Sequence, residues 1–243
     1  MSKQFTLVYG TQRVSYSVNP DPKRTTRIAI HVEPDGMVQV DAPPGFPDQA
    51  VQKAVQKRAR WVVDHVAEAR QRYAHVSPRE YVSGEQILYL GRRYVLKVIA
   101  TQSGGTSVKL KANRLEVVTR SSDPDDIRGR VRGWYRAKAR DYFCRRLDEL
   151  SVKSPWVEEV PPFKLQKMTR QWGSCSPSGQ IILNPHLIKA PRECIEYVLI
   201  HELAHLKHHD HGAQFWALIN RQVPGWEKPK AVLDNMVELL HNG

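Results

Sequence analysis

Five of the ten histidines in this 243-residue chain fall within residues 201–211, where His201-Glu202-Leu203-Ala204-His205 has the pattern H-E-x-x-H. Side chains four positions apart lie on the same face of an α-helix, one turn apart. Two imidazoles in this arrangement can bind one zinc ion, and a glutamate beside them can accept a proton from water. The pattern therefore predicts a Zn²⁺ centre at His201 and His205, with Glu202 as the general base.

A third zinc ligand is expected shortly after His205, because a catalytic zinc ion takes three protein ligands and keeps a fourth position for water. The candidates are His208, His209 and His211. A straight helix would place His209 roughly 12 Å along the axis from His201, which bonds of about 2 Å cannot close. The ligand must then come from chain that has turned back, and a glycine directly after His211 favours a turn there. We therefore expect His211, with His208 and His209 at a polar helix end.

The helix that carries the motif is predicted to be buried. Pro191 fits its first turn. Apolar residues follow on most of its faces, at Ile195, Val198, Leu199, Ile200, Leu203 and Leu206. Titratable groups inside such a helix are costly unless a metal or another partner satisfies them, so the site should lie at the centre of a domain.

The composition is typical of a protein of the cytoplasm, with no membrane partner. The length suffices for one large domain or two small ones. No apolar run reaches 18 residues, and Met1-Ser2-Lys3-Gln4 does not begin a signal peptide. The three cysteines, Cys144, Cys175 and Cys194, have no framework spacing and are expected to be reduced thiols.

The net charge of +12 indicates an anionic partner, such as nucleic acid or a nucleotide, or else a merely solvated basic surface. A helix expected over about 124–151 combines eight arginine and lysine residues with Trp134, Tyr135, Tyr142 and Phe143. Such a helix either binds nucleic acid by base stacking or packs its aromatic side chains inward and leaves its cations in water.

The remaining pattern predicts strands in the first half of the chain and a mixture after it. Alternating residues predict strands at 5–18 around Gly10, at 27–32 and 37–40 around an Asp35-Gly36 turn, at 81–99, 107–111 and 114–119. One basic helix is expected over 48–72. Further strands are expected at 163–168 and 180–184, and further helices at 213–222 and 228–240. No internal repeat is visible in the sequence.

These pieces together resemble the YgjP-like metal-dependent hydrolases, relatives of the SprT/Spartan zincin metallopeptidases. The resemblance covers nearly the whole chain, and its most specific parts are Trp172-Gly173-Ser174-Cys175 and the H-E-x-x-H stretch. Its other pieces are Tyr81–Glu85, Arg170-Gln171, Leu183-Asn184, Tyr197-Val198, His211–Trp216, the Asp35-Gly36 turn and Trp61. The family pattern supports His201, His205 and His211 as ligands and Glu202 as base. The extra histidines His208 and His209 depart from that pattern.

The resemblance implies an α+β fold, with a β-rich N-terminal region over 1–120 and a zincin-like catalytic domain over 121–243. That domain would hold a small sheet and the metal helix at its centre. Arg170, Trp172, Cys175 and Asn184 are expected around the substrate pocket. Cys175 is expected to be a buried thiol near the metal, because a permanent fourth ligand would close the site.

Two enzymatic interpretations and one non-enzymatic interpretation follow. The favoured one is a zinc metallopeptidase, in which a peptide or protein substrate pairs with an edge strand at Gln180–Asn184. The second is a nucleoside triphosphate (UTP-type) pyrophosphatase, because the resemblance includes YgjP-like proteins to which cleavage of nucleoside triphosphates is assigned. Against it, a three-histidine zinc site is unlike the usual carboxylate–Mg²⁺ arrangement, and no Gly-rich phosphate loop is present. The third is a basic nucleic-acid-binding module with a structural zinc ion.

Overall fold

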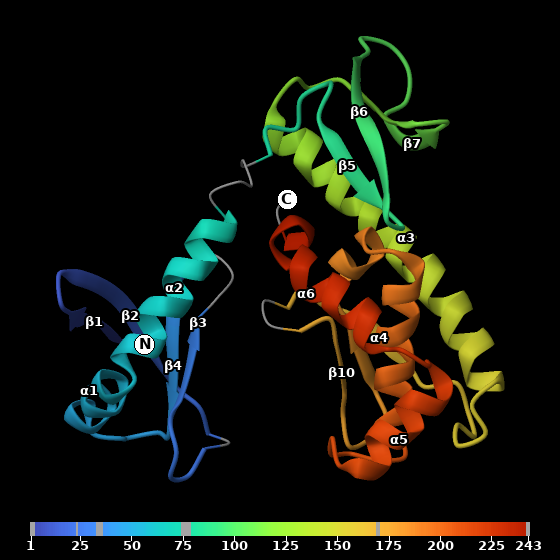
Figure 1. The fold of residues 1–243 in the computed structure, drawn as a ribbon. Helices are drawn as coiled ribbons and strands as arrows, with labels where there is room; N and C mark the ends of the chain where they lie inside the picture. The colour runs from blue at the N-terminus through green and yellow to red at the C-terminus, as the bar shows by residue number, and fades with distance from the viewer. Residues whose placement is uncertain (1–2, 23, 33–35, 74–78, 169–170, 242–243) are drawn as a thin grey trace. The chain divides into compact units, whose positions relative to one another are not determined.

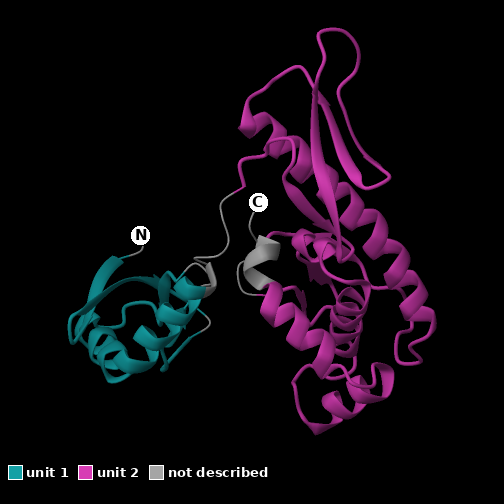
Figure 2. Ribbon diagram, turned by 45° about the horizontal axis from the view of Figure 1, so that its top comes forward, with its two compact units in different colours: residues 1–77 teal, residues 78–243 magenta. Residues whose placement is uncertain are grey.

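The computed structural model describes residues 3–22, 24–32, 36–73, 79–168 and 171–241. The chain divides into two compact units, Met1–Ser77 and Pro78–Gly243 (Figure 2). Each unit has its own hydrophobic core, which is why each can be compact by itself. None of the helices in the described ranges is long and apolar enough to cross a membrane.

The first unit is a four-stranded sheet with two helices packed on it. Alternation along the strands buries Leu7, Val14 and Val40 against the helix residues Val55 and Val62. The strands pair in the order β1-β2-β4-β3. The elements are β1 (Lys3–Tyr9), β2 (Gln12–Pro20), β3 (Ala29–Val32), β4 (Val38–Ala42), α1 (Asp48–Lys57) and α2 (Ala59–Tyr73).

Two details of this unit bear on the sequence predictions. The expected helix over 48–72 is two helices, because Arg58 leaves the helical region with φ −109° and ψ 18°. Strands β3 and β4 pair antiparallel as the Asp35-Gly36 turn predicts, although Asp35 itself lies outside the described residues.

The second unit begins with a sheet of the same topology (Figure 1). Its strands pair in the order β5-β6-β8-β7, and β6 and β8 are parallel, as β2 and β4 are in the first unit. The chain therefore repeats a ββββα arrangement that is not visible as a repeat in its sequence. The elements are β5 (Gln86–Tyr89), β6 (Arg92–Ala100), β7 (Ser107–Lys111), β8 (Arg114–Thr119) and α3 (Pro124–Val152).

The rest of the second unit consists of a small sheet and three further helices. The sheet has the order β10-β11-β9, so β11 is its central strand. Strand addition to Gln180–Asn184 is therefore wrong, because both sides of β11 are already paired. The elements are β9 (Phe163–Leu165), β10 (Gly173–Cys175), β11 (Ile181–Leu183), the 3₁₀ helix η1 (Pro185–Lys189), α4 (Arg192–Ala204), α5 (Ala213–Gln222) and α6 (Glu227–His241).

Helix α3 joins the two sheets of the second unit through a single hydrophobic core. Its aromatic side chains are buried, from Phe143 with no exposed surface to Tyr142 with 9%. They pack together with Leu96 and Leu115 of the β5–β8 sheet and with Leu199 of α4. The boundary between the two compact units therefore follows residue 77, whereas the sequence analysis placed it after residue 120. The α+β class expected from the sequence is confirmed.

The turn between β5 and β6 is hydrogen-bonded to the end of η1 and lies against Pro191, the N-cap of α4. The amides of Leu90 and Gly91 donate to the carbonyls of Ile188 and Lys189, at 2.9 and 3.1 Å. Gly91 has φ +76°, and a Cβ there would lie 2.8 Å from Cα of Pro191. Only glycine satisfies both the turn and this close approach.

We expect Gly91→Ala to lower the free energy of unfolding by roughly 2–4 kcal/mol, since it combines a left-handed alanine with a backbone clash. Urea unfolding followed by circular dichroism measures the change. Gly129→Ala on the exposed side of α3, where a new Cβ meets no atom within 4 Å, is the control. It should stabilise the protein by about 0.5–1 kcal/mol. Equal effects of both substitutions would contradict this account of the turn.

Candidate metal centre

Packing and polar contacts hold helix α4, which carries the functional groups, in its position. Ile195, Leu199 and Leu203 have no exposed surface. On the α3 side, Oε2 of Glu196 forms an ion pair with Nη2 of Arg146 at 2.6 Å. The indole of Trp156 donates to the carbonyl of Leu203 at 3.0 Å, close to the end of the helix. The position of α4 is therefore set by packing and by contacts at both ends.

The structure brings His201, His205 and His211 together. One ring nitrogen from each lies within 4.8 Å of the others. Nε2 of His201 and Nε2 of His211 are 3.0 Å apart. His205 is the C-cap of α4, and the chain then turns back, so that His211 approaches from beyond the helix. Two tetrahedral zinc ligands with bonds of about 2.0–2.1 Å would lie roughly 3.3 Å apart, close to this separation.

The three imidazoles are held by neighbours as well as by the backbone. Nδ1 of His205 lies 3.0 Å from the carbonyl oxygen of His208, which favours a proton on Nδ1 and leaves Nε2 as an electron-pair donor. The fully buried ring of Phe215 contacts all three, with ring centroids 4.7 to 4.9 Å apart. The indole of Trp216 stacks on His211. Such packing fixes the ring orientations in advance of any ligand.

Burial keeps the imidazoles of His201 and His205 neutral. It lowers the pKa of His201 to about 3, with further contributions from His205 and His211. It lowers the pKa of His205 as well, against the opposing effect of the hydrogen bond to the His208 carbonyl and with further lowering by His211 and His209. Neutral imidazole is the form that binds a metal ion, so at neutral pH these two residues are ready for a metal ion without losing protons.

Glu202 is buried beside the histidines, with 4% of its surface exposed. Its Oε2 atom has no hydrogen-bond partner within the described part of the chain, and neither does Nδ1 of His201. Burial raises the pKa of the Glu202 carboxyl to about 8. A buried carboxyl without partners is costly, and a divalent cation at the histidines would offset that cost by attraction.

The residues of this site fit a metal ion. Three imidazole nitrogens converge, and one oxygen of a buried acid beside them has no hydrogen-bond partner among the described residues. Three imidazoles suit zinc and similar divalent ions. His208 and His209 do not join this group among the described residues.

A cavity of about 240 Å³ opens beside His201 and Glu202. Trp172 and Gly173 line one side of it, and Tyr197 lines another. A Cβ on Gly173 would lie 2.6 Å from Oε1 of Glu202, so the absence of a side chain there makes room for the carboxylate. The glycine of the Trp-Gly-Ser-Cys stretch therefore has a steric role that the sequence analysis did not assign.

The other expected pocket residues have different surroundings. Asn184 is fully buried, and its amide donates to the carbonyls of Met168 and Gln171 at 2.8 and 3.3 Å. It thereby holds the segment that leads into Trp172 and does not line the cavity. Cys175 lies on β10, where burial and the charge of Glu202 raise its pKa to about 11. Its thiol therefore stays protonated at neutral pH and is a poor nucleophile. Arg170 lies outside the described residues.

The cavity lining also includes Tyr197, Lys230 and Asp234, which the sequence analysis did not name as site components. Burial raises the pKa of Tyr197 to about 12, so its hydroxyl keeps its proton. Nζ of Lys230 and Oδ2 of Asp234 form an ion pair at 2.6 Å along α6. The i, i+4 spacing of that pair was visible in the sequence, but nothing local to it indicated which cavity it would border.

The fold and this site define a metallohydrolase built on an H-E-x-x-H helix. The family described as "YgjP-like, metallopeptidase domain" matches residues 26–236. The chain belongs to this YgjP-like family, and the resemblance seen in its sequence is confirmed. No curated protein matches the chain.

Solved structures with local similarity include two described as metallopeptidase zymogens. One is abylysin of Pyrococcus abyssi, with 28% identity over 43% of this chain and 97% of that chain, at a TM-score of 0.33. The other is jannalysin of Methanocaldococcus jannaschii, with 21% identity over 40% of this chain and 96% of that chain, at a TM-score of 0.34. At such TM-scores neither likeness bears on the function.

Burial of Glu202 predicts a pH dependence of the stability of the metal-free protein. Above about pH 4.5 the unfolded chain releases this proton, whereas the folded protein keeps it up to a pKa of about 8, so stability falls through that window. From pH 6.5 to 8 the wild type should lose about 2 kcal/mol relative to Glu202→Gln, at ~1.36 kcal/mol per pH unit. Urea unfolding of both proteins with chelator measures this difference. Parallel stability curves would contradict the raised pKa.

Proposed function

We propose that this protein is a zinc-dependent peptidase, with His201, His205 and His211 as the metal ligands and Glu202 as the general base. The observation that carries this proposal is the three converging imidazoles beside a buried glutamate. When bound, zinc supplies Lewis acidity, which acidifies water and polarises a peptide carbonyl. The family membership supports a hydrolase of this type.

Glu202 performs the proton transfers in this proposal. Its carboxylate accepts a proton from the attacking water and later donates a proton to the leaving amine. A bound cation beside it would lower its pKa from the value near 8 that burial alone gives, so that the basic form prevails at neutral pH. Gly173 keeps the carboxylate in place, because any larger residue there would occupy its position.

Strand β10 is the part of the sheet best suited to hold an extended peptide. It forms one edge of the β10-β11-β9 sheet, and it begins at Gly173, directly against Glu202. A peptide that adds to such an edge gains main-chain hydrogen bonds, and its side chains can enter the adjoining cavity. Trp172 and Tyr197 offer that cavity aromatic walls.

The surroundings of the site disfavour a nucleoside triphosphate as substrate. The one basic residue that lines the cavity within the described part of the chain is Lys230, and it is paired with Asp234. Glu202 adds a further acid to the lining. Apart from the proposed metal ion, a polyphosphate would therefore meet no excess of positive charge from the side chains there, and phosphate sites usually provide one.

A nucleic-acid-binding module with structural zinc also lacks support from the described residues. The aromatic side chains that interleave with the cations of α3 are buried in the core. They are therefore not available to stack on bases, which was the feature that motivated this interpretation.

Metal analysis tests the proposed ligands. We expect about one zinc ion per chain in the wild type and a loss of more than tenfold in zinc occupancy for His201→Ala, because two ligands do not complete the site. Inductively coupled plasma mass spectrometry of dialysed protein gives the occupancy. His209→Ala, an exposed histidine in the same stretch, should keep the wild-type occupancy. Equal occupancy in both variants would refute the assignment.

Cleavage of an unstructured peptide mixture tests the reaction. Glu202→Gln should lower kcat by about 10²–10⁴ and leave zinc occupancy unchanged, as expected for loss of a general base. Gly173→Ala should lower it by about 10² through displacement of the carboxylate, whereas Gly133→Ala on α3 should have no effect. Mass spectrometry of the products, with nucleoside triphosphates in a parallel reaction, measures both activities. Pyrophosphate made by wild type alone would overturn the peptidase proposal.

A further inference from the structure

The third histidine of the metal centre, His211, lacks the support that the backbone gives to the other two. It comes from the chain between α4 and α5 and is the exposed member of the three, whereas His201 and His205 lie at the end of the buried helix. A metal-binding imidazole usually has a carbonyl or carboxylate on its second nitrogen, which fixes the plane of the ring. His205 has such a partner in the carbonyl of His208. Among the described residues, the ring of His211 has its polar contact with His201 alone, so its orientation depends on packing.

A series of stacked aromatic rings leads from His211 back to α4. Trp216, on α5, stacks on His211 with ring centroids 5.7 Å apart and an interplanar angle of 26°. Trp226 stacks on Trp216 at 4.4 Å and 21°, and Tyr197 of α4 stacks on Trp226 at 6.0 Å and 11°. Aromatic pairs in such arrangements attract each other beyond the effect of their burial. Three packed rings thereby connect the third histidine to the buried helix.

Trp226 is the central ring of this series, and it contacts no histidine ring among the described residues. The turn between α5 and α6 sets its backbone, because Gly225 has φ +74° and the amide of Trp226 donates to the carbonyl of Val223 at 3.1 Å. Helix α4 packs against both of the helices that flank this turn (Figure 1). The indole of Trp226 is therefore held by its own backbone and by Tyr197, and it can support Trp216.

We propose that Trp226 is a positioning residue of the metal centre, which orients His211 through Trp216. A ligand ring that is oriented before the metal ion arrives loses less conformational entropy on binding, so the affinity for the metal ion is higher. Trp226 needs no contact with the metal ion for this effect. The inference rests on the proposed function only in taking the three histidines as metal ligands.

The zinc affinity of the full chain tests this role, measured by competition with a chromophoric chelator. We expect Trp226→Ala to weaken zinc binding by about 10- to 100-fold, as the loss of a residue that orients a metal ligand does. Trp226→Phe keeps an aromatic ring in the series and should weaken binding by about threefold or less. Trp134→Ala on α3 is the matched control, because Trp134 also packs against two tyrosine rings, each at 5.1 Å, and does not line the histidine cavity. It should lower the stability of the protein and leave its zinc affinity unchanged.

A double-mutant cycle with His211→Ala tests whether the effect runs through the third ligand. In a protein that already lacks His211, Trp226→Ala should weaken zinc binding further by about threefold or less, because no third ring remains to be oriented. The visible absorption of the Co²⁺-loaded protein gives a second readout. The spectrum of Trp226→Ala should move toward that of His211→Ala, which a general loss of stability would not cause.

Three results would overturn the inference. Equal zinc affinity of Trp226→Ala and wild type would show that His211 needs no such support. Additive losses in the double variant would show that Trp226 acts elsewhere. A wild type that binds no zinc would overturn the inference together with the proposed function. Zinc binding with the expected losses, but without cleavage of any peptide, would support the positioning role and overturn the peptidase proposal alone.

Discussion

The burial of a carboxyl group inside an apolar helix is the constraint on which the second unit depends. Glu202 lies on α4 with 4% of its surface exposed, and Leu199 and Leu203 of the same helix have none. A carboxyl group in such a place either keeps its proton, as its raised pKa allows, or has its charge compensated by a cation, which the proposed metal ion on the neighbouring imidazoles would supply. The return of the chain to His211, the ring of Phe215 and the missing side chain at Gly173 all serve this compensation.

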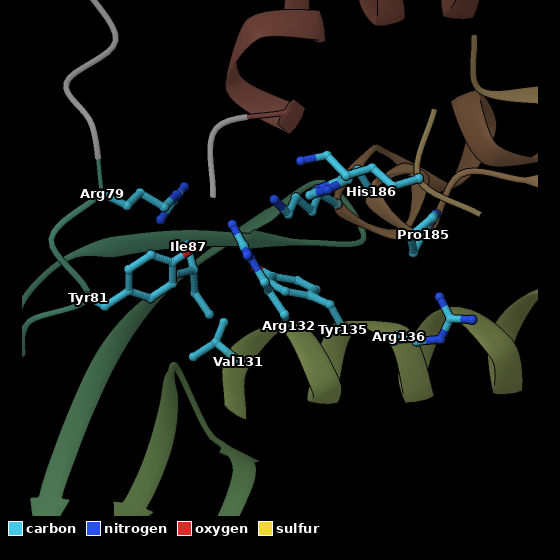
Figure 3. Close-up of a pocket in the computed structure, with 11 residues that line it drawn as sticks. Arg79, Tyr81, Ile87, Val131, Arg132, Tyr135, Arg136, Pro185 and His186 are labelled. Atoms are coloured by element: carbon cyan, nitrogen blue, oxygen red, sulfur yellow. The ribbon is translucent and has the colours of Figure 1, made fainter. Parts of the chain in front are cut away.

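Buried hydrogen bonds also hold together the segments of the second unit that precede the metal helix. Asn184 caps η1 by accepting from the amide of His186, and its own amide holds the carbonyl of Gln171. Gln171 lines the histidine cavity, and His186 lines a second cavity beside α3 (Figure 3). One buried side chain thus forms hydrogen bonds with the backbone of a residue from each lining. A change of η1 would have to break these buried hydrogen bonds, which argues for a rigid wall rather than a hinge.

The sequence predicted the elements that have a periodic residue pattern. It missed the features that depend on contacts between segments far apart in the chain. Periodicity located nearly all strands and helices, and the H-E-x-x-H spacing located the metal helix. It could not locate β10, because a three-residue strand has no period to detect. Nor could it show that β11 is central, because pairing order is a tertiary property. The role of Gly173 follows from its contact with a glutamate 29 positions later, which local patterns do not contain.

The net charge of +12 shows most clearly what sequence alone leaves open. As a total, it suggested an anionic substrate or merely a solvated surface. The structure separates these possibilities by position. The cavity at the metal helix pairs its one described basic residue, Lys230, with Asp234, whereas five cationic side chains are among the described residues that line the cavity beside α3. The basic character therefore does not describe the hydrolytic site. A substrate for that site is better sought among peptides than among polyanions.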